Sequence, residues 1–499
     1  MPRRPPFWLT LLIILIGLPL CLPFLYVILR ATEVGLTRSV ELLFRPRMAE
    51  LLSNTMLLMV CVTIGAISLG TLCAFLLERY RFFGKAFFEV AMTLPLCIPA
   101  FVSCFTWISL TFRVEGFWGT IGIMTLSSFP LAYLPVSAIL KRLDRSLEEV
   151  SLSLGKSPVY TFWYAIFPQL KPAIGSSILL IALHMLVEFG AVSILNYQTF
   201  TTAIFQEYEM SFNNSTAALL SAVLMAICIL IVFGEIFFRG KQTLYHSGKG
   251  VTRPYLVKTL SFGFYSSIFI LSIGVPVIML IYWLIVGTSL ESAGDFSEFL
   301  SAFSNSFIIS GLGALLTVMC ALPLVWAAVR YRSYLTIWID RLPYLLHAVP
   351  GLVIALSLVY FSIHYANDLY QTFFVIIIAY FMLYLPMAQT TLRASLEQLS
   401  DQIEKVGQSL GRNSFYIFRT LTLPAILPGV AAAFALVFLN LMKELTATLL
   451  LTPNDIKTLS IAVWEHTSDA QYAAATPYAL MLVLFSGIPV FLLKKYAFK

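Results

Sequence analysis

Charged residues are scarce in this chain of 499 residues, where Asp, Glu, Lys and Arg together make up only 11%. A water-soluble domain needs roughly 25% charged residues to cover its surface. The shortage therefore excludes a soluble globular protein. Although the net charge is +7, nucleic-acid binding is also excluded, because no soluble domain carries a basic face with aromatic platforms.

Cysteine is uncommon as well, and a phosphate-binding loop is missing. The seven cysteines form no CxxC pair, which favours small apolar packing residues over disulfides or metal ligands. Gly155-Lys156-Ser157 resembles the end of a phosphate-binding loop, but the GxxxxGKS pattern requires glycine where Val150 stands. We therefore expect no ATPase site, no enzyme activity and no permanently bound cofactor in this chain.

Long apolar runs, in contrast, are abundant, and 59% of the residues are hydrophobic. About 20 apolar residues span a bilayer as a helix, and none of the runs alternates like a barrel strand. We therefore predict an all-α, polytopic protein of the lipid bilayer with about twelve transmembrane helices. The predicted spans start near these residues: Phe7, Leu51, Phe87, Trp118, Ala173, Thr216, Thr259, Phe303, Trp338, Thr372, Ile426 and Ala474.

The first apolar run, residues 7–29, follows Arg3 and Arg4 and could be a signal peptide. Its length and the lack of a small-x-small cleavage site favour a helix that stays in the protein. Most Lys and Arg residues fall in segments that face the cytoplasm if the N-terminus is inside. We therefore expect both termini in the cytoplasm.

A polar stretch interrupts the apolar sequence twice, at residues 143–172 and 399–428. The copies are 256 positions apart and share these residues: Glu148 with Glu404, Gly155 with Gly411, Pro168 with Pro424, and Pro172 with Pro428. Earlier in the chain, an offset of 251 positions matches these residues: Asn54 with Asn305, Arg79 with Arg330, and Pro99 with Pro350. The chain is therefore a duplication.

The duplication divides the chain into three segments. We predict a first half at residues 1–240 and a second half at 259–499, each with about six spans, joined by a cytoplasmic linker at 241–258. Six is an even number, so the halves are parallel repeats with the same orientation, and a pathway is expected between them. Both polar stretches then lie in the cytoplasm.

The two polar stretches resemble the EAA motif of permease subunits of ATP-binding-cassette importers. That motif reads Glu-Ala-Ala, three residues, Gly, nine residues and then Ile-x-Leu-Pro. The first copy matches it with Glu149-Val150-Ser151, Gly155 and Ala165-Ile166-Phe167-Pro168, and the second with Lys405-Val406-Gly407, Gly411 and Leu421-Thr422-Leu423-Pro424. Lys405 replaces the motif's Glu, while Glu404 keeps the preceding acid. The resemblance covers essentially the whole chain, as two fused halves of the type I importer fold.

By this resemblance, each polar stretch docks one subunit of a cytoplasmic ATP-binding dimer, and ATP is hydrolysed on that partner. The docking residues are Glu148, Glu149 and Gly155 in the first half, and Glu404 and Gly411 in the second. Glycine suits this position, because it ends a helix in the left-handed conformation and so makes a helix-turn-helix. The resemblance also implies a periplasmic substrate-binding protein and a bacterial inner-membrane location.

Two acids in apolar surroundings are candidates for the translocation pathway. Glu188 and Glu444 occupy equivalent places in the fifth predicted span of each half. A charge there is costly unless it is hydrated, paired or bound to a cation, and carboxylate oxygens suit a hard cation. The alternative is a structural role, in which Glu188 accepts helix hydrogen bonds and Glu444 pairs with Lys443 or a neighbouring helix.

Four other residues are weaker candidates for metal contact. His184 lies one helical turn before Glu188 on the same face and is followed by Met185; the other two are Tyr208 and His466. A single histidine in a membrane helix is more often a hydrogen-bonded structural residue. The sequence leaves both readings open.

The segments around the two acids also resemble the fused permeases for ferric ion, in EFGA at 188–191 and KELTATLLL at 443–451. This resemblance favours Fe(III) as the substrate, with thiamine, polyamines or another small solute as alternatives. A secondary transporter driven by protons or sodium would also explain the repeats and the two acids. It would not explain two cytoplasmic helix-glycine-helix loops.

Overall fold

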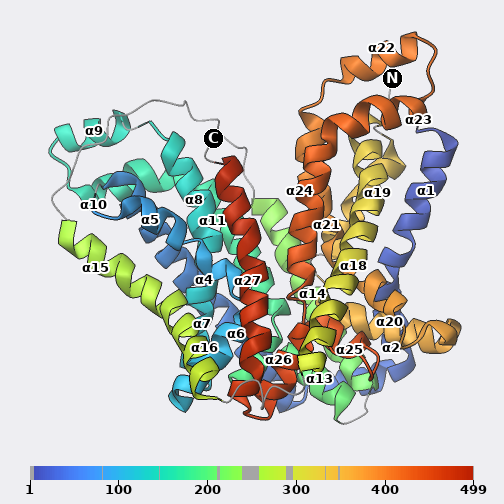
Figure 1. Cartoon of the computed structure of the whole chain (residues 1–499), viewed down its shortest axis with the longest axis horizontal. Helices are drawn as coiled ribbons and strands as arrows, with labels where there is room; N and C mark the ends of the chain where they lie inside the picture. Colours follow the sequence, from blue (N-terminus) through green and yellow to red (C-terminus); the bar gives the residue numbers. More distant parts are fainter. Residues whose placement is uncertain are drawn as a thin grey trace. The chain divides into compact units, whose positions relative to one another are not determined.

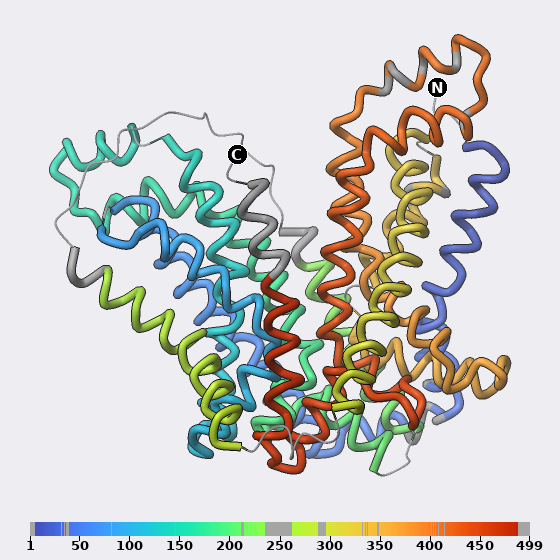
Figure 2. The backbone as a smooth tube through the Cα atoms, in the orientation of Figure 1, coloured from blue at the N-terminus to red at the C-terminus, as the bar shows by residue number. Residues whose placement is uncertain are grey.

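The structure is a computed structural model that describes residues 5–80, 82–144, 146–210, 214–238, 258–287, 296–331, 333–346 and 349–497. Every regular element among these residues is a helix, so the predicted all-α fold is confirmed (Figures 1 and 2). The predicted linker at 241–258 lies outside the described residues except for Lys258, at which α15 begins. Arg3 and Arg4 also lie outside them.

Nine helices in these ranges are long and apolar enough to cross a membrane: Phe7–Arg30, Pro46–Arg79, Phe117–Arg142, Pro158–Val187, Asn214–Gly234, Phe262–Val286, Phe296–Arg330, Phe373–Gln398 and Phe415–Leu441. Two further spans are bent helix pairs, and Tyr472–Gly487 is a shorter apolar helix. In order along the chain, these elements correspond to the twelve predicted spans. The polytopic architecture is therefore confirmed.

The third and ninth predicted spans are broken rather than continuous. Lys85–Cys97 meets Ala100–Leu110 at 94°, and Trp338–Leu346 meets Gly351–Tyr365 at 108°. Pro99 and Pro350 stand immediately before the second helix of each pair. Proline disfavours a helical conformation in the residue before it, and Ile98 is indeed extended, with φ −94° and ψ 119°. Matched prolines thus bend matched spans.

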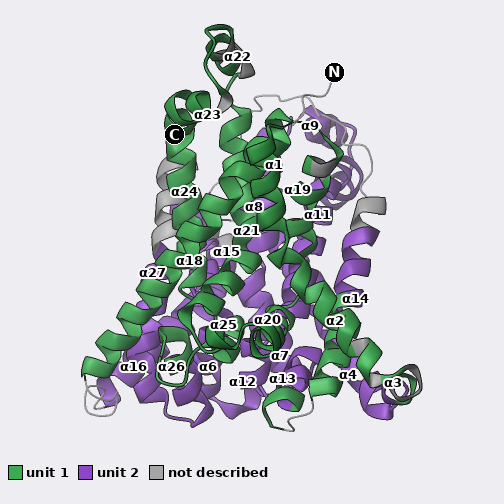
Figure 3. Cartoon of the chain, turned by 90° about the vertical axis from the view of Figure 1, so that its right-hand side faces the viewer, with its two compact units in different colours: residues 1–41, 207–225, 294–462 green, residues 42–206, 226–293, 463–499 purple. Residues whose placement is uncertain are grey.

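The chain forms two compact units, coloured separately in Figure 3. Unit 1 comprises Met1–Glu41, Glu207–Met225 and Gly294–Ala462, and unit 2 comprises Leu42–Gln206, Ala226–Ala293 and Val463–Lys499. The units do not coincide with the two sequence halves. The first predicted span belongs to the unit built mainly from the second half, whereas the seventh and twelfth belong to the unit built mainly from the first.

Unit 2 is built around the long helix α4. Its helices are α4 (Pro46–Arg79), α5 (Lys85–Ala91), η2 (Leu94–Cys97), α6 (Ala100–Leu110), η3 (Phe112–Val114), α7 (Phe117–Ser128), α8 (Pro130–Arg142), α9 (Ser146–Ser153), α10 (Pro158–Thr161), η4 (Phe162–Ile166), α11 (Phe167–Val187), α12 (Gly190–Ile194), α15 (Lys258–Phe269), η5 (Ile270–Gly274), α16 (Val275–Val286) and α27 (Tyr472–Ala497). Helices α7, α8 and α11 pack against α4, and α16 packs against α6 and α27. At Gly70 a Cβ atom would lie 2.6 Å from the carbonyl oxygen of Phe129, so glycine permits the close approach of α4 and α8.

Unit 1 is built around α18, the equivalent of α4 in the duplication. Its helices are α1 (Phe7–Gly17), η1 (Pro19–Cys21), α2 (Leu22–Val34), α18 (Phe296–Arg330), α19 (Tyr334–Leu346), α20 (Gly351–Tyr365), η6 (Asn367–Leu369), α21 (Phe373–Glu397), α22 (Asp401–Ser409), α23 (Ser414–Ile417), η7 (Phe418–Thr422), α24 (Leu423–Leu441) and α25 (Thr446–Leu451). Helices α21 and α24 pack against α18, and α1 packs against α18 and α19. Among the helices that the structure describes, four cross the boundary between the units: α3 (Leu36–Leu43), α13 (Phe200–Glu209), α14 (Asn214–Phe238) and α26 (Leu459–Ser468).

The predicted loops and the predicted pathway acids lie at different ends of each unit. In unit 1, α22 and α23 lie at one end and α25, which follows Glu444, lies toward the other (Figure 1). In unit 2, α9 and α12 are separated in the same way (Figure 3). Within each unit, the long central helix, α4 or α18, extends from one of these ends toward the other (Figures 1 and 3).

Candidate functional site

The two polar stretches form nearly identical helix-turn-helix loops. Helix α9 ends at Ser153 and α22 ends at Ser409, and two residues later Gly155 and Gly411 each adopt φ 74°. The Lys156 N–H donates to the Ser151 carbonyl at 3.2 Å, and the Arg412 N–H donates to the Gly407 carbonyl at 3.2 Å. These bonds satisfy carbonyls at the helix ends. Because φ is positive, glycine is the residue that closes both turns without strain.

The second helix of each loop runs into a single π-helical turn. Helix α10 is followed by η4, and α23 is followed by η7. The Phe167 N–H bonds to the Phe162 carbonyl, and the Leu423 N–H bonds to the Phe418 carbonyl, five residues back in each case. Pro168 and Pro424 follow directly, and a proline ring clashes with the carbonyl four residues before it. Sequence reasoning did not predict these turns, although the matched prolines were the signal.

Both loops expose large apolar side chains on otherwise polar segments. In unit 2, Leu154 is 72% exposed and Tyr164 71%, and in unit 1, Leu410 is 74% exposed. Lys156 lies over the Tyr160 ring at 5.0 Å, and Arg412 lies over the Tyr416 ring at 4.9 Å. Exposed apolar groups rimmed by polar residues are typical of protein interaction surfaces. Each loop therefore offers the same kind of surface.

The three predicted docking acids do not all face outward. Glu149 is exposed, whereas the Glu148 side chain is only 14% exposed and pairs with Arg79. Glu404 is buried and pairs with Arg330 at 3.1 Å. The side chain of Lys405 lies outside the described part. Glu148 and Glu404 were predicted to take part in docking; in the structure each carboxylate pairs with the arginine that ends a long helix, Arg79 of α4 or Arg330 of α18.

Glu188 stands at a helix break rather than inside a continuous span. Helix α11 ends at Val187, Glu188 is extended with φ −68° and ψ 128°, and α12 begins at Gly190. The Ala191 N–H donates to Glu188 Oε1 at 3.1 Å. The carboxylate therefore satisfies one of the free N–H groups at the start of α12, where the helix dipole also favours negative charge.

Glu444 repeats this geometry in unit 1. Helix α24 ends at Leu441, α25 begins at Thr446, and the Ala447 N–H donates to Glu444 Oε1 at 3.2 Å. In both units the donor is the residue three positions after the glutamate. The predicted equivalence of the two acids thus extends to their backbone surroundings.

The backbone carbonyl of each glutamate is also held by a hydroxyl. Thr201 Oγ1 donates to the Glu188 carbonyl at 2.7 Å, and Ser460 Oγ donates to the Glu444 carbonyl at 2.8 Å. A helix break leaves such carbonyls without an intrahelical partner. Both hydroxyls therefore stabilise the breaks from a following segment of chain.

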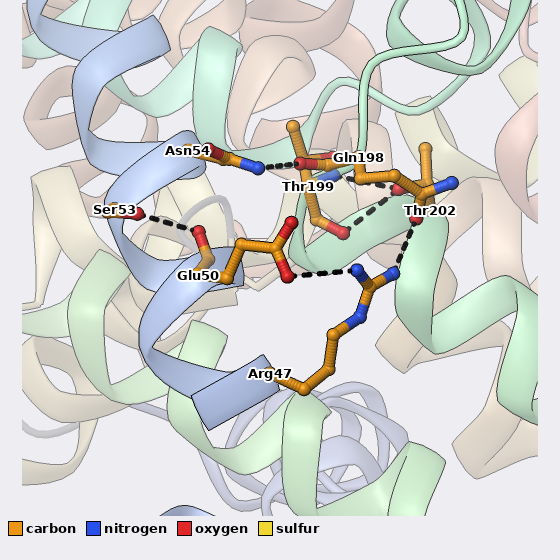
Figure 4. A network of polar contacts seen from close by, with 7 residues as sticks. All are labelled: Arg47, Glu50, Ser53, Asn54, Gln198, Thr199 and Thr202. Atoms are coloured by element: carbon orange, nitrogen blue, oxygen red, sulfur yellow. Dashed lines mark hydrogen bonds and ion pairs between the residues drawn. The ribbon is translucent and has the colours of Figure 1, made fainter. Parts of the chain in front are cut away.

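In both units that segment is tied to the start of the long central helix, and Figure 4 shows the contacts in unit 2. In unit 2, the Asn54 Nδ2 group of α4 donates to the Gln198 carbonyl at 3.2 Å, and Arg47 donates to Gln198 Oε1 at 3.2 Å. In unit 1, the Asn305 Nδ2 group of α18 donates to the Lys457 carbonyl at 3.1 Å. The matched asparagines were visible in the sequence, but their partners were not.

The hydroxyl next to each asparagine strengthens the same connection. The Phe200 N–H donates to Thr55 Oγ1 at 3.1 Å, and the Leu459 N–H donates to Ser306 Oγ at 2.7 Å. Thr55 and Ser306 are both buried. Each glutamate therefore belongs to a framework that includes the start of α4 or α18.

The second carboxylate oxygen differs between the units. His184 Nε2 lies 3.9 Å from Glu188 Oε2, and the His184 side chain is 41% exposed. In unit 1, the corresponding oxygen, Glu444 Oε2, accepts instead from the Tyr384 hydroxyl at 2.9 Å. His184 is thus placed beside Glu188 as predicted from their spacing. Asn440 occupies the position of His184 in the second half.

The remaining weak candidates do not join these sites. Met185 is 4% exposed and belongs to the apolar core of unit 2. Burial raises the pKa of the Tyr208 hydroxyl to about 12, which disfavours a phenolate ligand at neutral pH. His466 bonds to Gln471 at 3.0 Å and stacks on Tyr478.

The paired glutamates do not belong to a larger cluster of potential metal ligands in the described residues. Within the described ranges, no group of three or more His, Cys, Asp or Glu side chains could hold a metal ion. Each of the two glutamates presents a carboxylate at a helix break, with Oε1 bonded to an N–H group, and in unit 1 Oε2 also accepts from the Tyr384 hydroxyl. Such an oxygen can still accept a hard cation.

We expect the hydroxyls on the glutamate carbonyls to stabilise both breaks measurably. Thr201→Val and Ser460→Ala each remove one partly buried hydrogen bond, which typically costs about 1 kcal/mol; the Glu444 carbonyl keeps a second bond, from the Thr448 hydroxyl at 2.8 Å. The double variant should therefore unfold at a lower temperature than the parent in detergent. Ser304→Ala, which removes an exposed hydroxyl bond to the Ser301 carbonyl, is the control, and an equal Tm for both variants would contradict the role.

Both a family model and a near-identical relative match this chain. A family model described as "Binding-protein-dependent transport system inner membrane component" matches residues 66–240 and 321–496. The chain is 97% identical over 506 residues to the "Fe(3+)-transport system permease protein FbpB 2" of Haemophilus influenzae, covering 100% of both chains.

More distant relatives align over parts of the chain. The "Ferric transport system permease protein FbpB" of Actinobacillus pleuropneumoniae is 24% identical over 395 residues, covering 74% of this chain and 57% of that protein. The "Sulfate transport system permease protein CysT" of Escherichia coli is 27% identical over 252 residues, covering 46% of this chain and 91% of that protein. The second alignment has about the length of one repeat.

Proposed function

This chain belongs to the family of inner-membrane components of binding-protein-dependent transport systems, and on that premise we propose that it passes Fe(III) into the cytoplasm as the permease of an ATP-driven importer. The observation that carries the substrate is the similarity, along the entire chain, to a protein named as a Fe(3+) permease. The carboxylates of Glu188 and Glu444 at the two helix breaks independently support Fe(III), because carboxylate oxygens suit a hard cation.

The chemistry of the breaks favours a cation over an anion. Glu188 and Glu444 present carboxylate oxygens, which are suitable ligands for a hard ion. Sulfate, the substrate named for the half-length relatives, would meet negative charge at both positions. Thiamine and polyamines remain cationic alternatives, and the uptake experiment below distinguishes them.

The energy source that we propose is a cytoplasmic dimer of ATP-binding subunits, one on each loop. The exposed Leu154 and Leu410 suit apolar grooves on such subunits, and Glu149 suits a basic side chain at the rim of one groove. A periplasmic binding protein would deliver Fe(III) to the opposite face. This arrangement requires both termini and both loops to lie in the cytoplasm.

Uptake of radioactive Fe(III) tests the substrate assignment. Cells that carry this chain with its binding protein and ATPase should accumulate Fe(III), and cells lacking only this chain should not. Unlabelled thiamine, polyamine and sulfate in excess should leave the uptake unchanged. Loss of uptake in the presence of one of these competitors, with the complex assembled, would move the assignment to that solute.

A further inference from the structure

Each loop is fastened to the end of a long central helix by an arginine–glutamate pair. Arg79 is the last residue of α4 and Arg330 is the last residue of α18. Arg79 pairs with Glu148 and Arg330 with Glu404, and the exposed fraction of these four side chains lies between 7% and 14%. The sequence matches both arginines and both glutamates across the duplication, so the chain contains the same device twice.

Each arginine also holds the segment that leads into the loop helix. Arg79 Nη1 donates to the Leu140 carbonyl at 3.2 Å, near the end of α8. Arg330 Nη2 donates to the Leu399 carbonyl at 3.0 Å, just before α22. A planar guanidinium with several donors can bind a carboxylate and a carbonyl together. The end of the long helix is therefore joined to the loop at two points.

In unit 1 the pair extends to the π-helical turn. The Thr422 hydroxyl donates to Glu404 Oε1 at 3.1 Å, and Thr422 is the last residue of η7. In unit 2 the first and second loop helices are linked by Ser151 and Thr161 at 2.8 Å. Each loop is thus braced internally as well as fastened to the helix end, which favours movement as one body.

An exposed ion pair is screened by water and contributes little, but these pairs are removed from water. Taking two charges out of water is costly and is tolerated only with good geometry and further hydrogen bonds. Both arginines gain a further hydrogen bond of this kind from a carbonyl. The free-energy cost of burying these charges, present in both halves, is explained if the connection between each loop and its long helix is needed for function.

The opposite ends of α4 and α18 are connected to the helix breaks at Glu188 and Glu444. Asn54 on α4 and Asn305 on α18 each lie 25 residues before the arginine, a distance of about 38 Å along a helix. Asn54 and Asn305 hold the segments whose hydroxyls bind the Glu188 and Glu444 carbonyls. Helices α4 and α18 are therefore continuous links from loop to break.

We propose that Arg79–Glu148 and Arg330–Glu404 are positioning pairs, which make each docking loop move together with α4 or α18 and so carry that movement to the glutamate breaks. This inference rests on the proposed function for the source of movement, namely the ATP-binding subunits on the loops. Neither pair includes one of the glutamates proposed to line the pathway. Their role is to ensure that loop movement driven by ATP hydrolysis results in transport of Fe(III).

The test is the ratio of Fe(III) transported to ATP hydrolysed by the complete complex. Glu148→Gln with Glu404→Gln should lower this ratio by roughly tenfold or more, a size typical of coupling between sites, while hydrolysis continues. Exchanging the charges of both partners in both pairs (R79E/E148R with R330E/E404R) should give a higher ratio than reversing only the arginines or only the glutamates. Glu298→Gln, which breaks an exposed pair with Lys457 at the other end of α18, is the matched control and should leave the ratio unchanged.

The outcomes separate this proposal from the proposed function. An unchanged ratio in the double glutamine variant would overturn the positioning role while leaving the importer intact. A proportional loss of hydrolysis and transport would also overturn it, because the pairs would then serve only folding or assembly. Absence of ATP-dependent Fe(III) uptake in the parent complex would contradict the proposed function itself.

Discussion

Replacing Glu188 and Glu444 together by glutamine should reduce Fe(III) uptake by roughly ten- to a hundredfold, while the complex still assembles and hydrolyses ATP. Glutamine keeps an oxygen that can accept from the Ala191 and Ala447 N–H groups, so the helix breaks should survive. Only the negative charge is lost, and a hydrogen bond or contact to a charged group is typically stronger by about 1 kcal/mol or more than a neutral one. Uptake of radioactive Fe(III) and ATPase activity of the same preparation are the two measurements.

The control for this variant removes two other carboxylates that are exposed. Glu115→Gln and Asp368→Asn change one acid in each unit, and both side chains are exposed. This double variant should transport normally. Normal uptake by the Glu188 and Glu444 variant would instead assign both carboxylates to helix capping alone, which is the structural alternative left open by the sequence.

Replacing Gly155 and Gly411 together by valine should separate ATP hydrolysis from transport. Both glycines have φ 74°, a conformation that costs an L-residue roughly 1–2 kcal/mol and a β-branched residue more. Nothing lies within 4 Å of an added Cβ at either position, so the effect acts through the backbone turn alone. The protein should insert normally, and uptake should fall by roughly tenfold or more if both loops must keep their shape.

Two helical glycines serve as the matched control. Gly175 in α11 and Gly311 in α18 also have open space around an added Cβ, without a positive φ. Gly175→Val with Gly311→Val should therefore leave uptake close to that of the parent. Survival of transport in the Gly155 and Gly411 variant would contradict the docking role of the loops.

The fold was largely predictable because each span is a long apolar run with polar ends. The family inferred from the two loops is confirmed by the comparisons. The bends at Pro99 and Pro350 were not predicted, since neighbouring groups in a membrane protein can accommodate proline within a helix. The exchange of spans between the compact units was also not predicted, because it depends on tertiary packing and leaves no periodic signal in the sequence.

The candidate site was predictable in its residues but not in its geometry. Glu188 was found as a matched acid, yet the apolar pattern runs through it, and nothing in EFGA marks a helix end. Glu148 and Glu149 are adjacent acids of the same kind. Which of them turns inward is decided by Arg79, which lies 69 positions earlier in the chain. Hydrogen bonds over such separations require the folded structure.

The most direct measurement is Fe(III) accumulation in proteoliposomes that contain the purified complex of this chain with its ATP-binding subunits. The Fe(III)-loaded binding protein is added outside, and ATP is supplied to the face that carries the two loops. We expect Fe(III) to accumulate only when ATP is hydrolysed and only when Glu188 and Glu444 are intact. Equal accumulation without ATP, or none while the complex hydrolyses ATP in response to the binding protein, would contradict an ATP-driven Fe(III) pathway through this chain.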